Sequence, residues 1–138
     1  MTDLVFILSI AITWAFVKVV KTIIFWSKEK SLSLKALFYD GGMPSAHTTA
    51  VTAAATSIYI EAGLSVLFVL SFILAVIVMN DAMKVRWVTG EQSKVINHLM
   101  KGKKGFKKLE ERIGHTPEEV FVGLIIGILG PILIYAIA

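Results

Sequence analysis

Long apolar stretches recur along this chain, and they constrain its fold more than any other feature. A stretch of about 18 or more apolar residues can cross a hydrocarbon core of about 30 Å. The mean hydropathy is +0.75, and 56% of residues are hydrophobic against 17% charged, unlike an ordinary soluble domain. We therefore predict one all-α domain, an integral membrane four-helix bundle with a basic cytoplasmic loop between its third and fourth helices. The predicted helices span about 4–26, 43–62, 64–85 and 117–138, and the loop spans about 86–116.

The second predicted helix is the least apolar of the four. Its sequence, MPSAHTTAVTAAATSIYIEAG, is rich in alanine and threonine, so its insertion into lipid is marginal and it needs shelter from neighbouring helices. Small side chains suit close helix packing in membranes. The fourth helix has a stripe of small residues that fits packing within the bundle, with a homodimer as the alternative. The stripe consists of Gly123, Gly127 and Gly130.

All fourteen Lys and Arg residues fall on one side of the predicted membrane when the four segments cross alternately. The turn near 61–63, on the opposite side, has no cation. By the positive-inside rule the basic side is cytoplasmic and both termini lie outside. The net charge of +4 then describes a surface that faces anionic headgroups, so membrane lipids are the predicted partners and nucleic acid is not. The loop between the third and fourth helices is expected to be partly helical on the membrane surface.

The segment GGMPSAHTT, residues 41–49, lies at the predicted cytoplasmic end of the second helix. Its glycines allow a tight turn, and Pro44 is a residue type favoured at a first helical position. A helix that begins there directs the unpaired N–H groups of Ser45, Ala46 and His47 toward its end, where an anion such as phosphate binds well. The alternative is a plain helix start with an interfacial histidine, and the segment alone does not decide.

A second helix start is visible in RIGHTPEEVFVG, residues 112–123. Thr116 and Pro117 are typical of a helix cap and a first helical residue. Glu119 follows His115 by four residues, a spacing that allows the carboxylate to fix the imidazole tautomer and raise its basicity. The competing interpretation, which this segment alone favours, is a capping box between Thr116 and Glu119.

Ionisable residues gather near the same end of the predicted bundle. The third helix ends with NDAMKVR, residues 80–86, and the first helix ends with Lys21 and Lys28. Charges at membrane depth are costly and suggest function, although a single cation can also extend to the headgroups. Asp81 and Arg86 are five residues apart and therefore do not share one face of an α-helix. A phosphate-handling site explains jointly why histidines, carboxylates and cations from four segments converge.

Three of these motifs together resemble the divergent, small branch of the type 2 phosphatidic acid phosphatase superfamily, which is related to vanadium haloperoxidases. They are GGMPSAH, NDAMKVR and EERIGHTPEEVFVG, and the resemblance covers nearly the whole chain from about Lys21 onward. Pro44, Ser45 and His47 match the Pro-Ser-Gly-His motif of the superfamily, with Ala46 in place of its glycine.

The other two superfamily motifs are matched with substitutions. Lys21 is followed after six residues by Lys28, where the superfamily has arginine, and no arginine stands six residues before His115. Glu119 stands where the superfamily has aspartate. Arg86 is our candidate replacement for the missing arginine.

The resemblance implies metal-independent hydrolysis of a phosphomonoester through a phosphohistidine, with no cofactor. It implies that His115 attacks phosphorus, that Glu119 orients it, and that His47 protonates the leaving alkoxide. Preorganised donors would stabilise the developing charge on the phosphoryl oxygens. The groups that would hold them are Lys21, Ser45, the N–H of Ala46 and Arg86, with Asp81 and Lys28 in support.

The sequence therefore predicts a membrane lipid-phosphate phosphatase that works at the cytoplasmic face on a substrate whose tail stays in lipid. One alternative is a non-enzymatic protein that binds anionic phospholipids or acts as a scaffold. Another is a metal site, since histidine and carboxylate suit zinc or manganese. It would use His47, His115, Asp81 and Glu119. The third histidine, His98 in VINHLM, is expected to be an interfacial helix residue without a catalytic part, and the absence of cysteine excludes thiolate chemistry.

Overall fold

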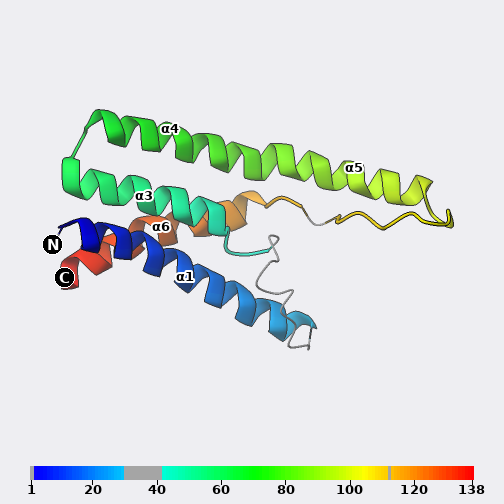
Figure 1. The fold of residues 1–138 in the computed structure, drawn as a ribbon, viewed down its shortest axis with the longest axis horizontal. Helices are drawn as coiled ribbons and strands as arrows, with labels where there is room; N and C mark the ends of the chain where they lie inside the picture. The colour runs from blue at the N-terminus through cyan, green and yellow to red at the C-terminus, as the bar shows by residue number, and fades with distance from the viewer. Residues whose placement is uncertain (1, 30–41, 112) are drawn as a thin grey trace.

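The computed structural model describes residues 2–29, 42–111 and 113–138, and this part of the chain is helical with no strand. The predicted all-α fold is confirmed (Figure 1). Three helices are long and apolar enough to cross a membrane: α1, the run from Val66 to Leu99, and α6. The elements are α1 (Thr2–Glu29), α3 (Ala46–Ala62), α4 (Val66–Asn80), the π-helix η1 (Asp81–Val85), α5 (Arg86–Leu99) and α6 (Pro117–Ile137).

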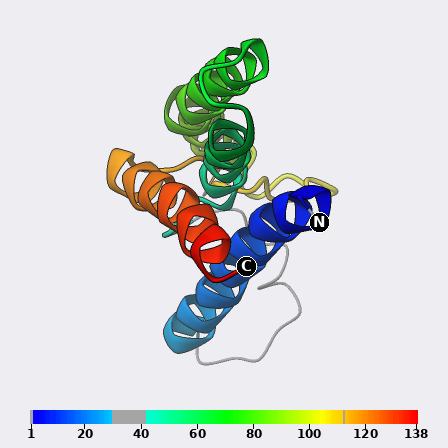
Figure 2. The same cartoon turned by 90° about the vertical axis from the view of Figure 1, so that its left-hand side faces the viewer.

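Helix α3 is the central element, since it packs against α1, α4 and α6 (Figures 1 and 2). It has 17 residues and is not among the three helices long and apolar enough to span. Its buried side chains are alanine, serine and threonine, and their hydroxyls donate to carbonyls one turn back, as Thr52 does to Thr48 at 2.7 Å. Such internal hydrogen bonds satisfy polar groups without water. The expectation that neighbouring helices shelter this segment is therefore confirmed.

The glycine stripe of α6 packs inside the bundle. A Cβ atom at Gly123 would lie 2.7 Å from the carbonyl oxygen of Ser45, and one at Gly127 would lie 2.8 Å from that of Thr49. Gly130 lies against Thr13 of α1 in the same way. The missing side chains thus let α6 approach α3 and α1 closely. The stripe is occupied within the chain, as the internal packing requires, and a homodimer stays an untested prediction.

The third predicted helix is much longer than expected. It was predicted to end near 85 and to be followed by a partly helical loop over 86–116, but α4, η1 and α5 form one run of helix to Leu99. The partial helicity of the loop is confirmed, and the boundary near 85 is not. The predicted boundary follows the fall in hydropathy after the apolar segment. A helix can continue beyond that point into polar sequence, so the boundary was placed too early. Figure 1 shows α5 continuing in the direction of α4, beyond the packed ends of α3 and α6.

The two ends of the bundle differ in composition. Both termini lie at one end together with the turn between α3 and α4 (Figure 1), where the Tyr135 hydroxyl donates to Glu61 Oε1 at 2.8 Å. The beginnings of α3 and α6 lie at the other end, next to η1. Among the described residues, this second end carries Lys21, Arg86 and the two motif histidines.

Candidate functional site

Backbone hydrogen bonds hold three separate segments together at the basic end of the bundle. The N–H of Ser45, at the start of α3, donates to the carbonyl of Glu119 in the first turn of α6, at 3.1 Å. The N–H of His115 donates to the carbonyl of Ala82 in η1, at 3.0 Å. These bonds join residues that are far apart in the sequence. They bring the two predicted helix starts and the NDAMKVR motif to one place.

His115 is the most buried histidine of the site, with 3% of its surface exposed. Its Nδ1 lies 2.8 Å from Oε2 of Glu119. The same oxygen accepts the N–H of Thr116 at 3.3 Å, and Thr116 Oγ1 accepts the N–H of Glu119 at 3.4 Å, which completes a capping box. The two interpretations of Glu119 therefore hold at once. Because a carboxylate accepts, Nδ1 carries the proton and Nε2 keeps a free lone pair.

The environment of His115 keeps its imidazole neutral. Burial lowers the pKa of His115, and the hydrogen bond to Glu119 partly offsets that effect. The positive charges of Lys21 and Arg86 also lower this pKa. Lys21, on α1, is itself 6% exposed. Two cations from two different elements thus lie within electrostatic reach of a neutral, nucleophilic ring.

Arg86 and Asp81 form an ion pair, with Nε 2.6 Å from Oδ2. The expectation that these residues do not share a helix face was wrong, because Asp81–Val85 form a π turn. In this turn the backbone N–H of Arg86 donates to the carbonyl of Asp81, five residues back. A π turn aligns residues five apart, and such turns are frequent at functional sites. Both side chains are 38% exposed, so the guanidinium is oriented by Asp81 and still reachable.

The start of α3 differs in detail from its prediction. The helix begins at Ala46, with Ser45 as its N-cap, so Pro44 precedes the cap instead of occupying the first helical position. Ser45 is fully buried, and its Oγ accepts from the N–H of Thr48 at 3.4 Å and from the Thr48 hydroxyl at 3.0 Å. Its N–H, predicted to be unpaired, donates to Glu119. A direct contact between Ser45 and a phosphoryl oxygen stays a prediction.

The next two residues are better placed to meet a ligand. Ala46 and His47 occupy the first two positions of α3, where a helix has no internal acceptor for the N–H groups. The His47 side chain is exposed, in contrast to the buried His115. The N-terminal end of α3 therefore combines backbone N–H groups that attract an anion with an accessible imidazole.

Some residues that the sequence singled out are not among those that the structure describes. The side chain of Lys28, together with Gly41 and Arg112, lies outside the described residues. Within the described part of the chain, no three His, Asp or Glu side chains are arranged to hold a metal ion. All four ligands of the metal alternative are described residues, so their arrangement does not support it.

Two glycines that the sequence reasoning missed position the site. Gly114, with φ of 101°, would bring a Cβ to 2.6 Å from the backbone nitrogen of Trp87. Gly90 would bring one to 2.8 Å from the carbonyl oxygen of Glu111. The segment before His115 thus lies directly on the start of α5, which places His115 close to Arg86. An isolated glycine in a helix, such as Gly90, is the signal that would have indicated this close approach.

Comparison with known proteins yields a family and a relative. The model of a family described as the Divergent PAP2 family matches residues 2–130. An uncharacterized membrane protein of Bacillus subtilis (strain 168), YuiD, is 41% identical over 131 residues, covering 83% of each chain. No solved structure matches. With three helices able to span, these matches make the chain a multi-pass membrane protein.

Proposed function

This chain belongs to the Divergent PAP2 family, and from that premise we propose that it hydrolyses a lipid phosphomonoester through a phosphohistidine on His115. The observation that carries the proposal is the buried His115, whose Nδ1 is held by Glu119 at 2.8 Å beside the charges of Lys21 and Arg86. A neutral, oriented imidazole next to cations is suited to attack on phosphorus.

The reaction takes two displacements at phosphorus. The Nε2 lone pair of His115 forms a bond to phosphorus while the bond to the ester oxygen breaks, and His47 gives its proton to the leaving alkoxide. Water then attacks phosphorus, His47 takes up its proton, and the P–N bond breaks to release orthophosphate. Glu119 stabilises the positive charge that His115 carries in the intermediate. Lys21, Arg86 and the N–H groups of α3 neutralise the phosphoryl oxygens.

The position of the site favours a substrate with a membrane-embedded tail. His115 lies directly before α6, one of the helices able to span, and Lys21 lies within α1. If these helices span the membrane, a phosphate group held there lies near the ends of two spanning helices, at the level expected for lipid headgroups. This argues for a lipid phosphomonoester, such as a phosphatidate or a prenyl phosphate, over a soluble one.

We expect purified protein in detergent micelles to release orthophosphate from lipid phosphomonoesters faster than from soluble ones with the same ester group. Vanadate should inhibit, because it adopts the trigonal bipyramidal geometry of phosphorus under attack, and a chelator should have no effect. The measurement is phosphate released across a panel of both substrate kinds. Lipid binding without release from any substrate would instead identify a scaffold or a lipid-binding protein.

The proposal also places the site in the cytoplasm, since the cations lie at the site end of the bundle. Because the chain has no cysteine, a single introduced cysteine is the only thiol, and its labelling shows on which side of the membrane it lies. In intact cells, a membrane-impermeant thiol reagent should label Leu64→Cys, in the turn between α3 and α4, and should not label Lys104→Cys. Labelling of Lys104→Cys alone would put the site on the outer face.

A further inference from the structure

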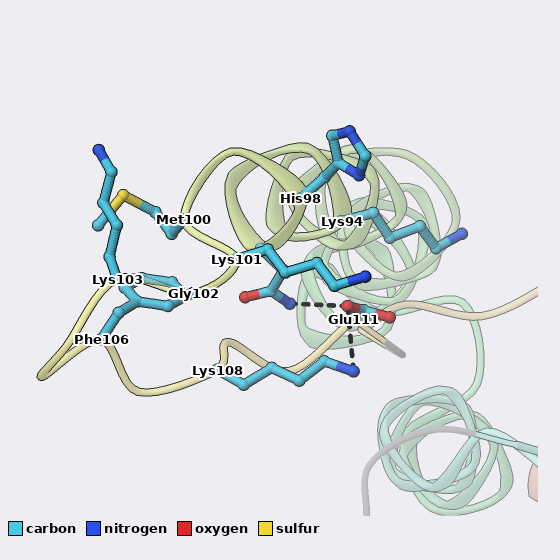
Figure 3. A pocket seen from close by; sticks show the side chains of 10 residues that line it. Lys94, His98, Met100, Lys101, Gly102, Lys103, Phe106, Lys108 and Glu111 are labelled. Atoms are coloured by element: carbon cyan, nitrogen blue, oxygen red, sulfur yellow. Dashed lines mark hydrogen bonds and ion pairs between the residues drawn. The ribbon is translucent and has the colours of Figure 1, made fainter.

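The end of α5 and the segment that follows it form the walls of an open hollow of about 550 Å³, named here the basic hollow (Figure 3). Lysines from the helix and from residues 100–111, named here the returning segment, line it. The side chains of Lys94, Lys101 and Lys108 extend toward the side of Glu111, and Lys103 extends past Met100 on the other side (Figure 3). Phe106 and Met100 supply an apolar wall. The volume lies within the range of small-molecule sites, about 300–1,000 Å³. The charged groups that line it are Lys94, Lys101, Lys103, Lys108 and Glu111.

Side-chain hydrogen bonds of Asn97 join the two walls of the basic hollow. The Asn97 amide nitrogen donates to the carbonyl of Leu109 at 2.9 Å and to Glu111 Oε1 at 2.7 Å. Its oxygen accepts the N–H of Leu109 at 2.8 Å. These three bonds fasten the returning segment to α5. The hydrogen bond from Asn97 has the largest effect on the pKa of Glu111 and lowers it, and the hydrogen bond and positive charge of Lys108 lower it further. The carboxylate of Glu111 therefore stays ionised.

The positive charge in the hollow is only partly compensated. Lys94 pairs with Glu91 at 2.6 Å, and Lys108 lies 3.4 Å from Glu111. Among the described residues, Lys101 and Lys103 have no acidic partner. A concave surface with uncompensated cations attracts anions.

The basic hollow is remote from the His115 site. Helix α5 has 14 residues, which places its end about 21 Å beyond Arg86 at 1.5 Å per residue. Because α5 continues in the direction of α4 (Figure 1), this end points away from the bundle. A dissolved anion has access to this end, and vesicles that contain phosphatidylglycerol test a lipid headgroup as the other source of the same phosphate chemistry.

We propose that the basic hollow binds a soluble anion carrying more than one phosphate group, at a site separate from His115. Lysine binds phosphate as a point charge, and several lysines around one space suit several phosphate groups. The apolar wall of Phe106 and Met100 accommodates an uncharged portion of the ligand. This site does not depend on the proposed phosphatase activity.

Inorganic tripolyphosphate is the probe, titrated calorimetrically into the purified full-length protein in detergent micelles at physiological salt. We expect saturable binding that Lys101→Gln with Lys103→Gln weakens about tenfold or more, since each lost charge-assisted contact is a substantial part of the affinity. Lys104→Gln with Lys107→Gln removes the same charge from the same segment outside the lining, and should change affinity less than threefold, an order-of-magnitude bound from surface screening. Asn97→Ala leaves the charge unchanged but frees the returning segment, so it should weaken binding as well.

His115→Ala should bind tripolyphosphate like the unmodified protein, which separates this site from the proposed catalytic one. Equal weakening by the two lysine pairs would mean general charge attraction and would overturn the proposal. So would an absence of saturable binding, including the case in which the protein captures only vesicles that contain phosphatidylglycerol.

Discussion

Replacing His115 by alanine is expected to reduce phosphate release by about 1,000-fold or more, because it removes the atom that forms the covalent intermediate. The fold should survive the change. The backbone N–H of His115 still donates to Ala82, and Glu119 still accepts from Thr116 in the capping box. The measurement is phosphate released from the best lipid substrate, with the thermal unfolding temperature recorded alongside.

His98→Ala is the matched control, since His98 is an exposed histidine near the end of α5, away from the site. It should retain full activity. A folded His115→Ala protein that still turns over at the original rate would remove His115 from the role of nucleophile. Loss of activity in both variants would point to damage that is not specific to the site.

Gly114→Ala is expected to lower activity about 100-fold, the typical cost of displacing a reacting group by about 1 Å. At φ of 101° an alanine is strained by about 1–3 kcal/mol. Its Cβ would also lie 2.6 Å from the backbone nitrogen of Trp87, so the segment has to move. His115 is the next residue and would move with it. The measurements are phosphate release and the thermal unfolding temperature.

Gly102→Ala separates strain from displacement. Gly102 has φ of 83°, so alanine there suffers a similar conformational cost, but nothing lies within 4 Å of the added Cβ. This control should lose some stability and keep its activity. If both variants were equally active, the close contact at Gly114 would have no part in positioning His115.

Features that depend on local composition were predicted correctly. The apolar stretches of α1, α4 and α6 indicate membrane helices because transfer into lipid depends on each segment's own side chains. The start of α6 was found because Thr116 and Pro117 carry its cap and first turn in adjacent residues. The family was recognised for the same reason, from short motifs with fixed spacing.

The errors concern the end of one helix, a local irregularity in the same helical run, and a contact between distant segments. The continuation of the third helix into α5 was missed because a fall in hydropathy marks the end of an apolar stretch and not the end of a helix. The pairing of Asp81 with Arg86 needs a π turn, and helical periodicity assumes an α-helix. Ser45 was expected to offer its N–H to a ligand, but the carbonyl of Glu119 accepts it.

The amino-acid sequence by itself determined that this chain is helical, lies in a membrane and carries two histidines at helix starts. Only the tertiary structure decided that Glu119 both caps α6 and holds His115, and that the charges of Lys21 and Arg86 act on the same imidazole. It also decided that a basic hollow forms at the end of α5. The physical reason is that helix formation and lipid transfer are short-range properties. Contacts such as Ser45 with Glu119, or His115 with Ala82, form only when packing brings distant backbone segments together.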